Sequence, residues 1–270
     1  MKTMQRLLLS LFWLLAPCSL LPAAKPNIIL FYTDDHGHAD LGIHGAVKDI
    51  QTPNLDALAR SGVVATHGYS TAPQCVPSRG GVMTGRFQGR FDLDNNGSAL
   101  DGFNRQTTIA TRLQNAGYAT AQFGKWHLGP TDAITKHGFK HVFSQNAQRP
   151  FSANITLDGQ DRPMSDLPPT EYHLDGCSKA AAAIIERYKD QPFFLYVPHL
   201  AVHAPFQPPD APQTPVVTKD SMHHGSRAIY KAMVERIDAL AGNLPVPVQA
   251  ELSQLLGLLC TAPGRLGLAG

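Results

Sequence analysis

Two continuous apolar runs constrain what this chain can fold into. They lie within residues 27–33 and 191–197, and both are rich in β-branched and aromatic side chains. A segment that is apolar at every position, instead of at alternate positions, is typical of a strand buried on both faces. Such strands occur in the middle of parallel sheets covered by helices, so an α/β protein is expected.

Helical segments alternate with the expected strands. In the first helix, Thr52 is the expected capping residue and Pro53 the first helical residue. In the second, Thr108 is expected to face outward, and the polar residues 144–170 are predicted to be a surface loop. This alternation predicts an α/β sandwich around a mostly parallel sheet. The helices are expected at 52–62, 107–116, 175–189 and 226–240, and further strands at 63–70 and 118–123.

Composition describes an ordinary globular protein. The chain has 270 residues, 43% of them apolar and 16% charged, which is enough for one large domain or two small ones. The formal net charge of +2 gives no indication of binding to nucleic acid or to a membrane surface. We therefore expect neither as a partner.

The first 24 residues have the pattern of a secretory signal peptide. Lys2 and Arg6 precede the apolar run 7–15, and small residues at 23–24 suit a cleavage site. An uncleaved membrane anchor is the alternative, but Pro17 and the short run argue against it. Nothing later in the sequence is apolar for long enough to cross a bilayer. A secreted or periplasmic protein is expected.

In such an oxidising compartment the cysteine count is informative. Cys18 falls in the signal peptide, which leaves Cys75, Cys177 and Cys260, an odd number. One thiol is therefore left free or chemically changed, and Cys75 is the candidate.

Cys75 lies beside an expected helix start. Pro77 is suited to the first turn of a helix, which would place Cys75 just ahead of the positive helix end, with Arg79 one turn further in. An anion at Cys75 would then meet the helix dipole and a guanidinium together. The alternative is a buried or disulfide-bonded cysteine beside an ordinary turn.

Polar side chains follow four expected strand ends. Because the carboxyl ends of parallel strands lie along one edge of a sheet, these groups are expected to converge. Carboxylates suit a hard cation, cationic groups suit an anion, and imidazoles suit proton transfer. The combination suits hydrolysis of a phosphate or sulfate ester, and spacing does not decide between them. The groups are Asp34 with Asp35, Cys75 with Arg79, Lys125 with His127, and His203 with His199 nearby.

Each of these groups also has an ordinary structural explanation. Asp34 and Asp35 could form a solvated turn, and Lys125 and His127 an exposed loop. His203 could simply pack in its proline-rich loop. The remaining early histidines could lie at the rim of a site, directly behind its ligand-binding residues, or on plain surface: His36, His38 and His44.

Several motifs in order resemble the formylglycine-dependent, arylsulfatase-like sulfatases of the alkaline-phosphatase-like superfamily. Cys75-Val-Pro-Ser-Arg79, followed by Met83-Thr-Gly85, is similar to the first sulfatase signature, and Gly124-Lys-Trp-His-Leu-Gly129 to the second. The segments 26–35, 53–56 and 193–205 also match, and the resemblance covers roughly residues 25–240. It implies an α/β/α sandwich around a mostly parallel sheet.

The resemblance also implies a chemistry for Cys75. A formylglycine-generating or anaerobic sulfatase-maturing enzyme would oxidise it to formylglycine, and its hydrated aldehyde would attack the sulfur of a sulfate ester. One Ca²⁺ would be held by Asp34, Asp35 and the oxygen of modified Cys75. The substrate would be an aryl sulfate or a sulfated carbohydrate.

Roles for the remaining groups follow from the same resemblance. Arg79 would steady the ionised diol, and His127 would exchange its proton. Lys125 would bind sulfate, and His203 would bind sulfate or protonate the leaving alcohol.

The family pattern breaks after Ala241. Sulfatases continue with a buried strand ending in Asp-Asn-Gly, a further lysine and a smaller subdomain, whereas residues 242–270 are rich in Leu, Gln and Gly. The expected organisation is therefore a signal peptide at 1–24, an incomplete sulfatase domain at 25–241 and an atypical tail. Calcium takes six to eight oxygens, so weak metal binding and low activity are expected. The alternatives are a noncatalytic sulfated-glycan-binding remnant and a phosphoesterase of the same superfamily.

Overall fold

The computed structural model describes residues 25–146, 149–153, 155–157, 160–162, 165–166, 172–204, 206, 208–209, 225–244 and 260–261. The expected signal peptide, and the tail apart from residues 242–244 and 260–261, lie outside the described residues.

A seven-stranded sheet forms the centre of the described chain, with strand order β7-β4-β3-β2-β8-β1-β9. Five neighbouring strands of this sheet are parallel: β3, β2, β8, β1 and β9. The other two, β4 and β7, pair antiparallel at one edge. The predicted mostly parallel sheet is confirmed. The strands are β1 Ile28–Thr33, β2 Ala119–Phe123, β3 His141–Asn146, β4 Arg149–Ala153, β7 Ser165–Asp166, β8 Phe193–Pro198 and β9 Cys260–Thr261. A separate two-stranded sheet pairs β5 Ile155–Leu157 with β6 Gln160–Arg162.

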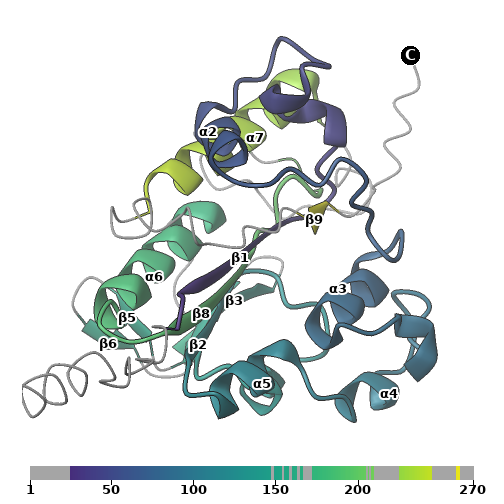
Figure 1. Cartoon of the computed structure of the whole chain (residues 1–270), viewed down its shortest axis with the longest axis vertical. Helices are drawn as coiled ribbons and strands as arrows, with labels where there is room; N and C mark the ends of the chain where they lie inside the picture. Colours follow the sequence, from purple (N-terminus) through teal and green to yellow (C-terminus); the bar gives the residue numbers. More distant parts are fainter. Residues whose placement is uncertain are drawn as a thin grey trace, which may run out of the picture.

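Helices cover both faces of the sheet (Figure 1). The helices α2, α6 and α7 lie on one face, and α3, α4 and α5 on the other. Their bounds are α2 Pro53–Ser61, α3 Cys75–Thr84, α4 Asp101–Asn104, α5 Ile109–Asn115, α6 His173–Arg187 and α7 Arg227–Gly242. Short 3-10 helices lie at η1 His38–Asp40, η2 Gly42–His44, η3 Gln88–Phe91 and η4 Thr131–His137.

The doubly covered sheet explains why its central strands are apolar at every position. Along β8, Phe193, Leu195 and Val197 pack under α6 and α7, whereas Phe194 and Tyr196 pack on the side of α3 and α5. Neighbouring residues of a strand point to opposite faces, so both sets are buried. The sandwich expected from the two apolar runs is confirmed.

The N-terminus of α2 is capped by another helix. Thr52 occupies the cap position, but its side chain makes no capping hydrogen bond and donates to Asp56 Oδ1 instead. The carboxylate of Asp238 on α7 accepts from Leu55 N and from Asn54 Nδ2, both at 2.8 Å. The predicted role of Thr52 is therefore wrong, because a carboxylate from α7 takes the free N–H group.

The strand predicted at 63–70 does not form. The chain there has no regular structure, and Val63 and Tyr69 are 96% and 83% exposed. Their β-branched and aromatic side chains favoured a strand, but a strand also needs a neighbour and a buried face.

The surface loop predicted at 144–170 is also wrong in part. β3 continues to Asn146, and β4 and β7 extend the sheet antiparallel beyond it. Strands pair through their backbone N–H and C=O groups, so a polar sequence with no regular alternation of apolar residues can still form edge strands.

One expected side-chain orientation is reversed. Thr108 is buried at the start of α5, where its hydroxyl donates to the carbonyl of His137 at 2.6 Å. The same oxygen accepts from Thr111 N, so the capping role turns this side chain inward.

Candidate active site

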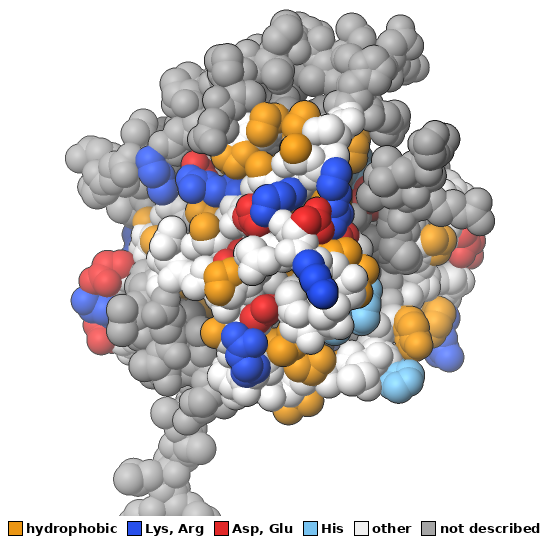
Figure 2. All heavy atoms as spheres, turned by 90° about the horizontal axis from the view of Figure 1, so that it is seen from above, with side chains coloured by type: hydrophobic (Ala, Val, Ile, Leu, Met, Phe, Trp, Pro, Cys, Tyr) orange, Lys and Arg blue, Asp and Glu red, His pale blue; other side chains and the backbone are white. Residues whose placement is uncertain are grey.

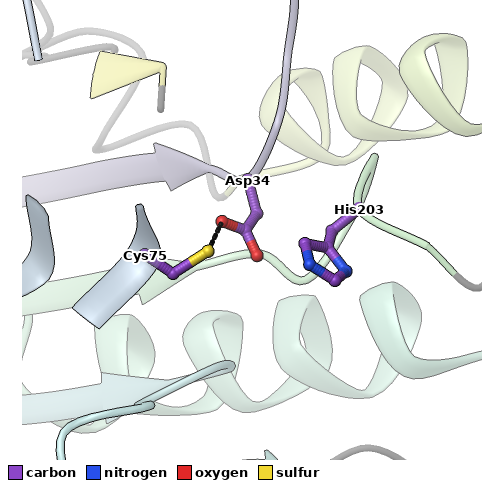
Figure 3. A group of neighbouring side chains, drawn as sticks. All are labelled: Asp34, Cys75 and His203. Carbon is purple, nitrogen blue, oxygen red and sulfur yellow. Dashed lines mark hydrogen bonds between the residues drawn. The ribbon is translucent and has the colours of Figure 1, made fainter. Parts of the chain in front are cut away.

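Three strand ends and one helix start bring the expected side chains together. Asp34 follows β1, Lys125 follows β2 and His203 follows β8. The fourth group was expected at a strand end, but Cys75 is the first residue of α3 and follows irregular chain. Figure 3 shows Asp34, Cys75 and His203 directed toward one another. One ligand atom from each of these three lies within 4.8 Å of the others.

Cys75 is a free, buried thiol with 7% exposure. Its Sγ lies 3.4 Å from Asp34 Oδ1 and 3.7 Å from Lys125 Nζ. Pro77 is the third residue of α3, not the first, so the helix begins earlier than predicted and Cys75 belongs to it. A proline is tolerated there because the first four N–H groups of a helix have no partner within it.

Asp34 is the centre of a buried charge cluster. Its Oδ1 pairs with Arg79 Nη2 at 3.3 Å, and its Oδ2 is in close contact with Lys125 Nζ. Burial opposes ionisation, but Arg79 and Lys125 outweigh it and lower the pKa of Asp34 to about 2. Asp34 is therefore a carboxylate at any physiological pH.

Arg79 is fully buried and held in place on several sides. Its Nη1 donates to the Lys125 carbonyl at 2.9 Å and to the Tyr196 hydroxyl at 3.3 Å. The guanidinium lies 5.1 Å from the ring centre of Tyr32, at cation–π distance. This environment keeps Arg79 charged and directed at Asp34.

Two tyrosines of this environment were missed in the sequence. Tyr196 contacts Arg79, and the Tyr32 hydroxyl lies 2.7 Å from Ser78 Oγ. Both stand at positions of β1 and β8 that face α3. A tyrosine in an otherwise wholly apolar central strand was the available signal, because a buried hydroxyl needs a partner.

Asp35 and His203 lie at the more exposed side of the site. Asp35 has a backbone φ of 56°, and its Oδ2 lies 3.7 Å from His203 Nε2. Burial and the neighbouring Asp34 raise the pKa of Asp35. His203 Nδ1 contacts the Ala204 carbonyl. A carbonyl only accepts, so Nδ1 carries a hydrogen, and Nε2 is the ring nitrogen that faces Asp35.

His127 lies on the exposed turn after β2, with a backbone φ of 57°. Partial burial, together with Lys125 and Arg79, lowers the pKa of His127 to about 4. Its imidazole is therefore neutral at pH 7 and able to accept a proton.

The other histidines of this region lie outside the cluster of Asp34, Cys75 and His203. His199 packs its ring 4.5 Å from Phe31, so His203 is the one that faces the site. His36 is 1% exposed, so it is not a surface residue, and its place directly after Asp35 fits the expected position behind the ligand-binding residues. His38 and His44 stack on each other 3.8 Å apart, outside the Asp34–Cys75–His203 cluster.

The donor set can be tested against Ca²⁺. Asp34 and Asp35 supply the hard carboxylate oxygens that Ca²⁺ requires. Cys75 in its thiol form supplies sulfur, which Ca²⁺ does not favour, whereas an oxygen at that position would match. The residues therefore fit Ca²⁺ only when Cys75 carries oxygen.

Residues 26–245 match the model of one protein family, the sulfatases. The matched segment contains the cysteine of Cys-x-Pro-x-Arg, the paired aspartates and the lysine. The chain belongs to the sulfatase family. Its sheet and two helix layers are the alkaline-phosphatase-like α/β/α fold found in sulfatases and phosphonate monoester hydrolases. The predicted family and fold are confirmed.

Among sulfatase relatives, the "Arylsulfatase" of Klebsiella aerogenes is 29% identical over 243 residues, which are 80% of this chain and 51% of that protein. The sulfatase-family chain described here thus spans about half the length of that relative.

This chain also matches about half the length of two chains of known structure. Ps i-CgsB in complex with k-i-k-neocarrahexaose has a TM-score of 0.65 at 29% identity, covering 85% of this chain and 56% of that one. A protein solved with its substrate D-glucosamine-2-N,6-O-disulfate has a TM-score of 0.57 at 25% identity, covering 85% and 52%.

Proposed function

We propose that this sulfatase-family chain carries the nucleophile of a sulfate ester hydrolase, formed by oxidation of Cys75 to formylglycine. The observation that carries the proposal is the position of Cys75: first residue of α3, in contact with Asp34 and Lys125. A formylglycine-generating or anaerobic sulfatase-maturing enzyme would supply the oxidation.

The state of the thiol supports the need for a modification. Burial and the neighbouring Asp34 raise the pKa of Cys75, so it is a neutral thiol at pH 7. A neutral thiol is a poor nucleophile. A hydrated aldehyde at the same carbon instead carries two hydroxyl groups.

Those two hydroxyls allow a complete cycle. One oxygen attacks sulfur, the bond from sulfur to the leaving oxygen breaks, and the alcohol departs with a proton. The other hydroxyl then loses its proton, the aldehyde re-forms and sulfate is expelled. Water adds to the aldehyde and restores the diol.

Each neighbouring side chain suits one part of this cycle. Lys125 and Arg79 place positive charge beside Cys75 for the sulfate oxygens and the ionised diol. The exchange of the diol's proton is assigned to His127 on the family resemblance, and its imidazole is neutral at pH 7. His203, on the exposed side, protonates the leaving alcohol or binds sulfate.

One Ca²⁺ is part of the proposal. Asp34, Asp35 and the oxygen replacing the Cys75 sulfur would hold it, and when bound it supplies positive charge that lowers a hydroxyl pKa and neutralises sulfate. These three ligand residues are fewer than the six to eight oxygens that Ca²⁺ takes. We therefore expect weak calcium binding and low turnover from this chain alone.

The substrate is proposed to be a sulfated carbohydrate in preference to an aryl sulfate. The support comes from relatives whose structures hold a neocarrahexaose and a disulfated glucosamine. Binding of a sulfated glycan without catalysis would use the same Arg79 and Lys125, so transfer of sulfate to residue 75 is what separates the two proposals. A phosphate ester remains the competing substrate.

A secreted or periplasmic location is proposed from residues 1–24 alone. The helices in the described part of the chain are all too short or too polar to span a bilayer. N-terminal sequencing of protein recovered from the producing cells tests the location, and an uncleaved Met1 would contradict it.

The function is tested with Cys75→Ser. A serine can take the sulfate from an aryl sulfate but has no second hydroxyl to expel it. The variant should therefore release at most one phenol per chain and keep the sulfate on the introduced hydroxyl, where mass spectrometry detects it. Cys75→Ala is the matched control and should give neither signal. Labelling by an aryl phosphate and not by the sulfate would support the phosphoesterase instead.

A further inference from the structure

The Asp34–Cys75–His203 cluster has the ligand types of a metal site while Cys75 is unmodified. Its ligand atoms are one carboxylate oxygen, one sulfur and one imidazole nitrogen, drawn from three elements and lying within 4.8 Å of one another. Figure 3 shows all three side chains directed inward, with the sulfur toward Asp34.

We infer that the unmodified chain binds a divalent transition-metal ion, of which Zn²⁺ is the best match, through Asp34 Oδ1, Cys75 Sγ and His203 Nε2. Mixed sulfur, nitrogen and oxygen ligands suit Zn²⁺, and three protein ligands leave a fourth position for water. Ca²⁺ does not favour sulfur, so the two forms of Cys75 select different metals.

The distance between the sulfur and oxygen ligands fits tetrahedral coordination of the ion. Zn–S and Zn–O bonds of about 2.3 and 2.0 Å place sulfur and oxygen about 3.5 Å apart. Cys75 Sγ and Asp34 Oδ1 are already 3.4 Å apart. Only His203 must move closer, and its side chain is 27% exposed at the edge of the site.

His203 is also oriented as a ligand. Its Nδ1–H donates to the Ala204 carbonyl, which leaves Nε2 as the ring nitrogen available to a metal ion. A hydrogen bond of this kind fixes the tautomer and ring orientation of metal-binding histidines.

Two cations oppose the ion. Arg79 and Lys125 both pair with Asp34, so they lower the affinity that the ligand set alone would give. The Asp35 carboxylate beside His203 offsets part of this charge. Binding also breaks the S–H bond of Cys75, and its proton passes to solvent as the metal–sulfur bond forms.

The test uses Co²⁺ as a spectroscopic probe on the full chain with unmodified Cys75, followed by displacement with Zn²⁺. We expect one Co²⁺ per chain, with a thiolate-to-metal absorption band that Zn²⁺ abolishes. Cys75→Ala should lose the band and weaken Zn²⁺ binding at least about tenfold. His203→Ala should weaken binding without removing the thiolate band.

Cys177→Ala is the matched control, because Cys177 is also a free thiol and is buried under the opposite helix layer. It should leave the band unchanged, and His38→Gln, in the stacked pair outside the cluster, should do the same. Lys125→Met removes a positive charge beside the site and should therefore tighten Zn²⁺ binding. A purely structural role of Lys125 would not predict this gain.

A Co²⁺ complex without the band, or one that survives Cys75→Ala, would overturn the inference. Neither result bears on formylglycine formation or sulfate transfer, since those tests use a modified or substituted residue 75.

Discussion

At the residue scale, the site depends on one carboxylate that is shared by two cations and a thiol. Asp34 contacts Arg79, Lys125 and Cys75, and it lies at the end of the apolar run that forms β1. The sequence motifs predicted these residues as a group. They could not predict that the cations would be buried against Asp34, because that depends on how the end of β1 meets α3.

Replacing Arg79 should destabilise the fold. Arg79→Met leaves Asp34 with one cation fewer and the Tyr196 hydroxyl without its donor, and removing one partner of a buried pair costs about 3–5 kcal/mol. Urea unfolding measures the change. Arg112→Met, on the exposed side of α5, is the control, and equal stability of the two variants would contradict the buried pair.

His36 should make stability depend on pH. Burial lowers its pKa from 6.5 to about 4, so between these values the unfolded chain binds a proton that the folded chain does not. Stability is complete above pH 6.5 and falls by about 3 kcal/mol as the pH approaches 4. Unfolding free energies at pH 7 and pH 4 should therefore differ less in His36→Gln than in the wild type.

The exposed His67 provides the control for that comparison. His67→Gln should keep the full pH dependence. If His36→Gln keeps it as well, the buried histidine is not its source.

At the element scale, sequence predicted the strands that have a long apolar run and missed the strands that have none. β1, β2 and β8 were found because their side chains are enclosed by two helix layers. β3 was missed because only Val142 and Phe143 of its six residues are apolar, although both are buried. β4 and β7 were missed because they pair at the sheet edge and have no regular alternation of apolar residues. Residues 63–70 were predicted as a strand although their apolar side chains face solvent. Propensity without a neighbouring strand does not determine structure.

The approach of β2 to β8 depends on a glycine. Gly124 has a φ of 131°, and a Cβ there would lie 2.0 Å from the Pro198 carbonyl oxygen. That oxygen accepts the Lys125 N–H at 2.7 Å, so the contact also positions Lys125. Gly124→Ala should force the two strand ends apart.

Gly45→Ala separates this steric effect from backbone strain. Gly45 also has a positive φ, of 66°, but nothing lies within 4 Å of a Cβ there. We expect it to cost about 1 kcal/mol, and Gly124→Ala at least about 2 kcal/mol more, in thermal or urea unfolding. Equal losses would show that the close approach to Pro198 does not matter.

At the scale of the whole molecule, the site lies at the carboxyl ends of the parallel strands, with Asp34 and Arg79 buried and Asp35 and His203 on its more exposed side. Opposite charges lie next to each other on the face that Figure 2 shows. Around α7, Arg227 pairs with Asp40 and Asp49, and Arg236 pairs with Asp175. The surface is thus balanced there, and the concentrated charge lies in the buried cluster at Asp34.

The family and fold follow from the whole pattern, whereas the chemistry depends on one side chain. The most direct test is mass spectrometry of the tryptic peptide 61–79, which contains Cys75, from chain produced together with a formylglycine-generating enzyme. We predict an aldehyde at residue 75, with Cys177 of the same preparation still a thiol. An intact thiol at Cys75, in cells where that enzyme converts another sulfatase, would contradict the proposal.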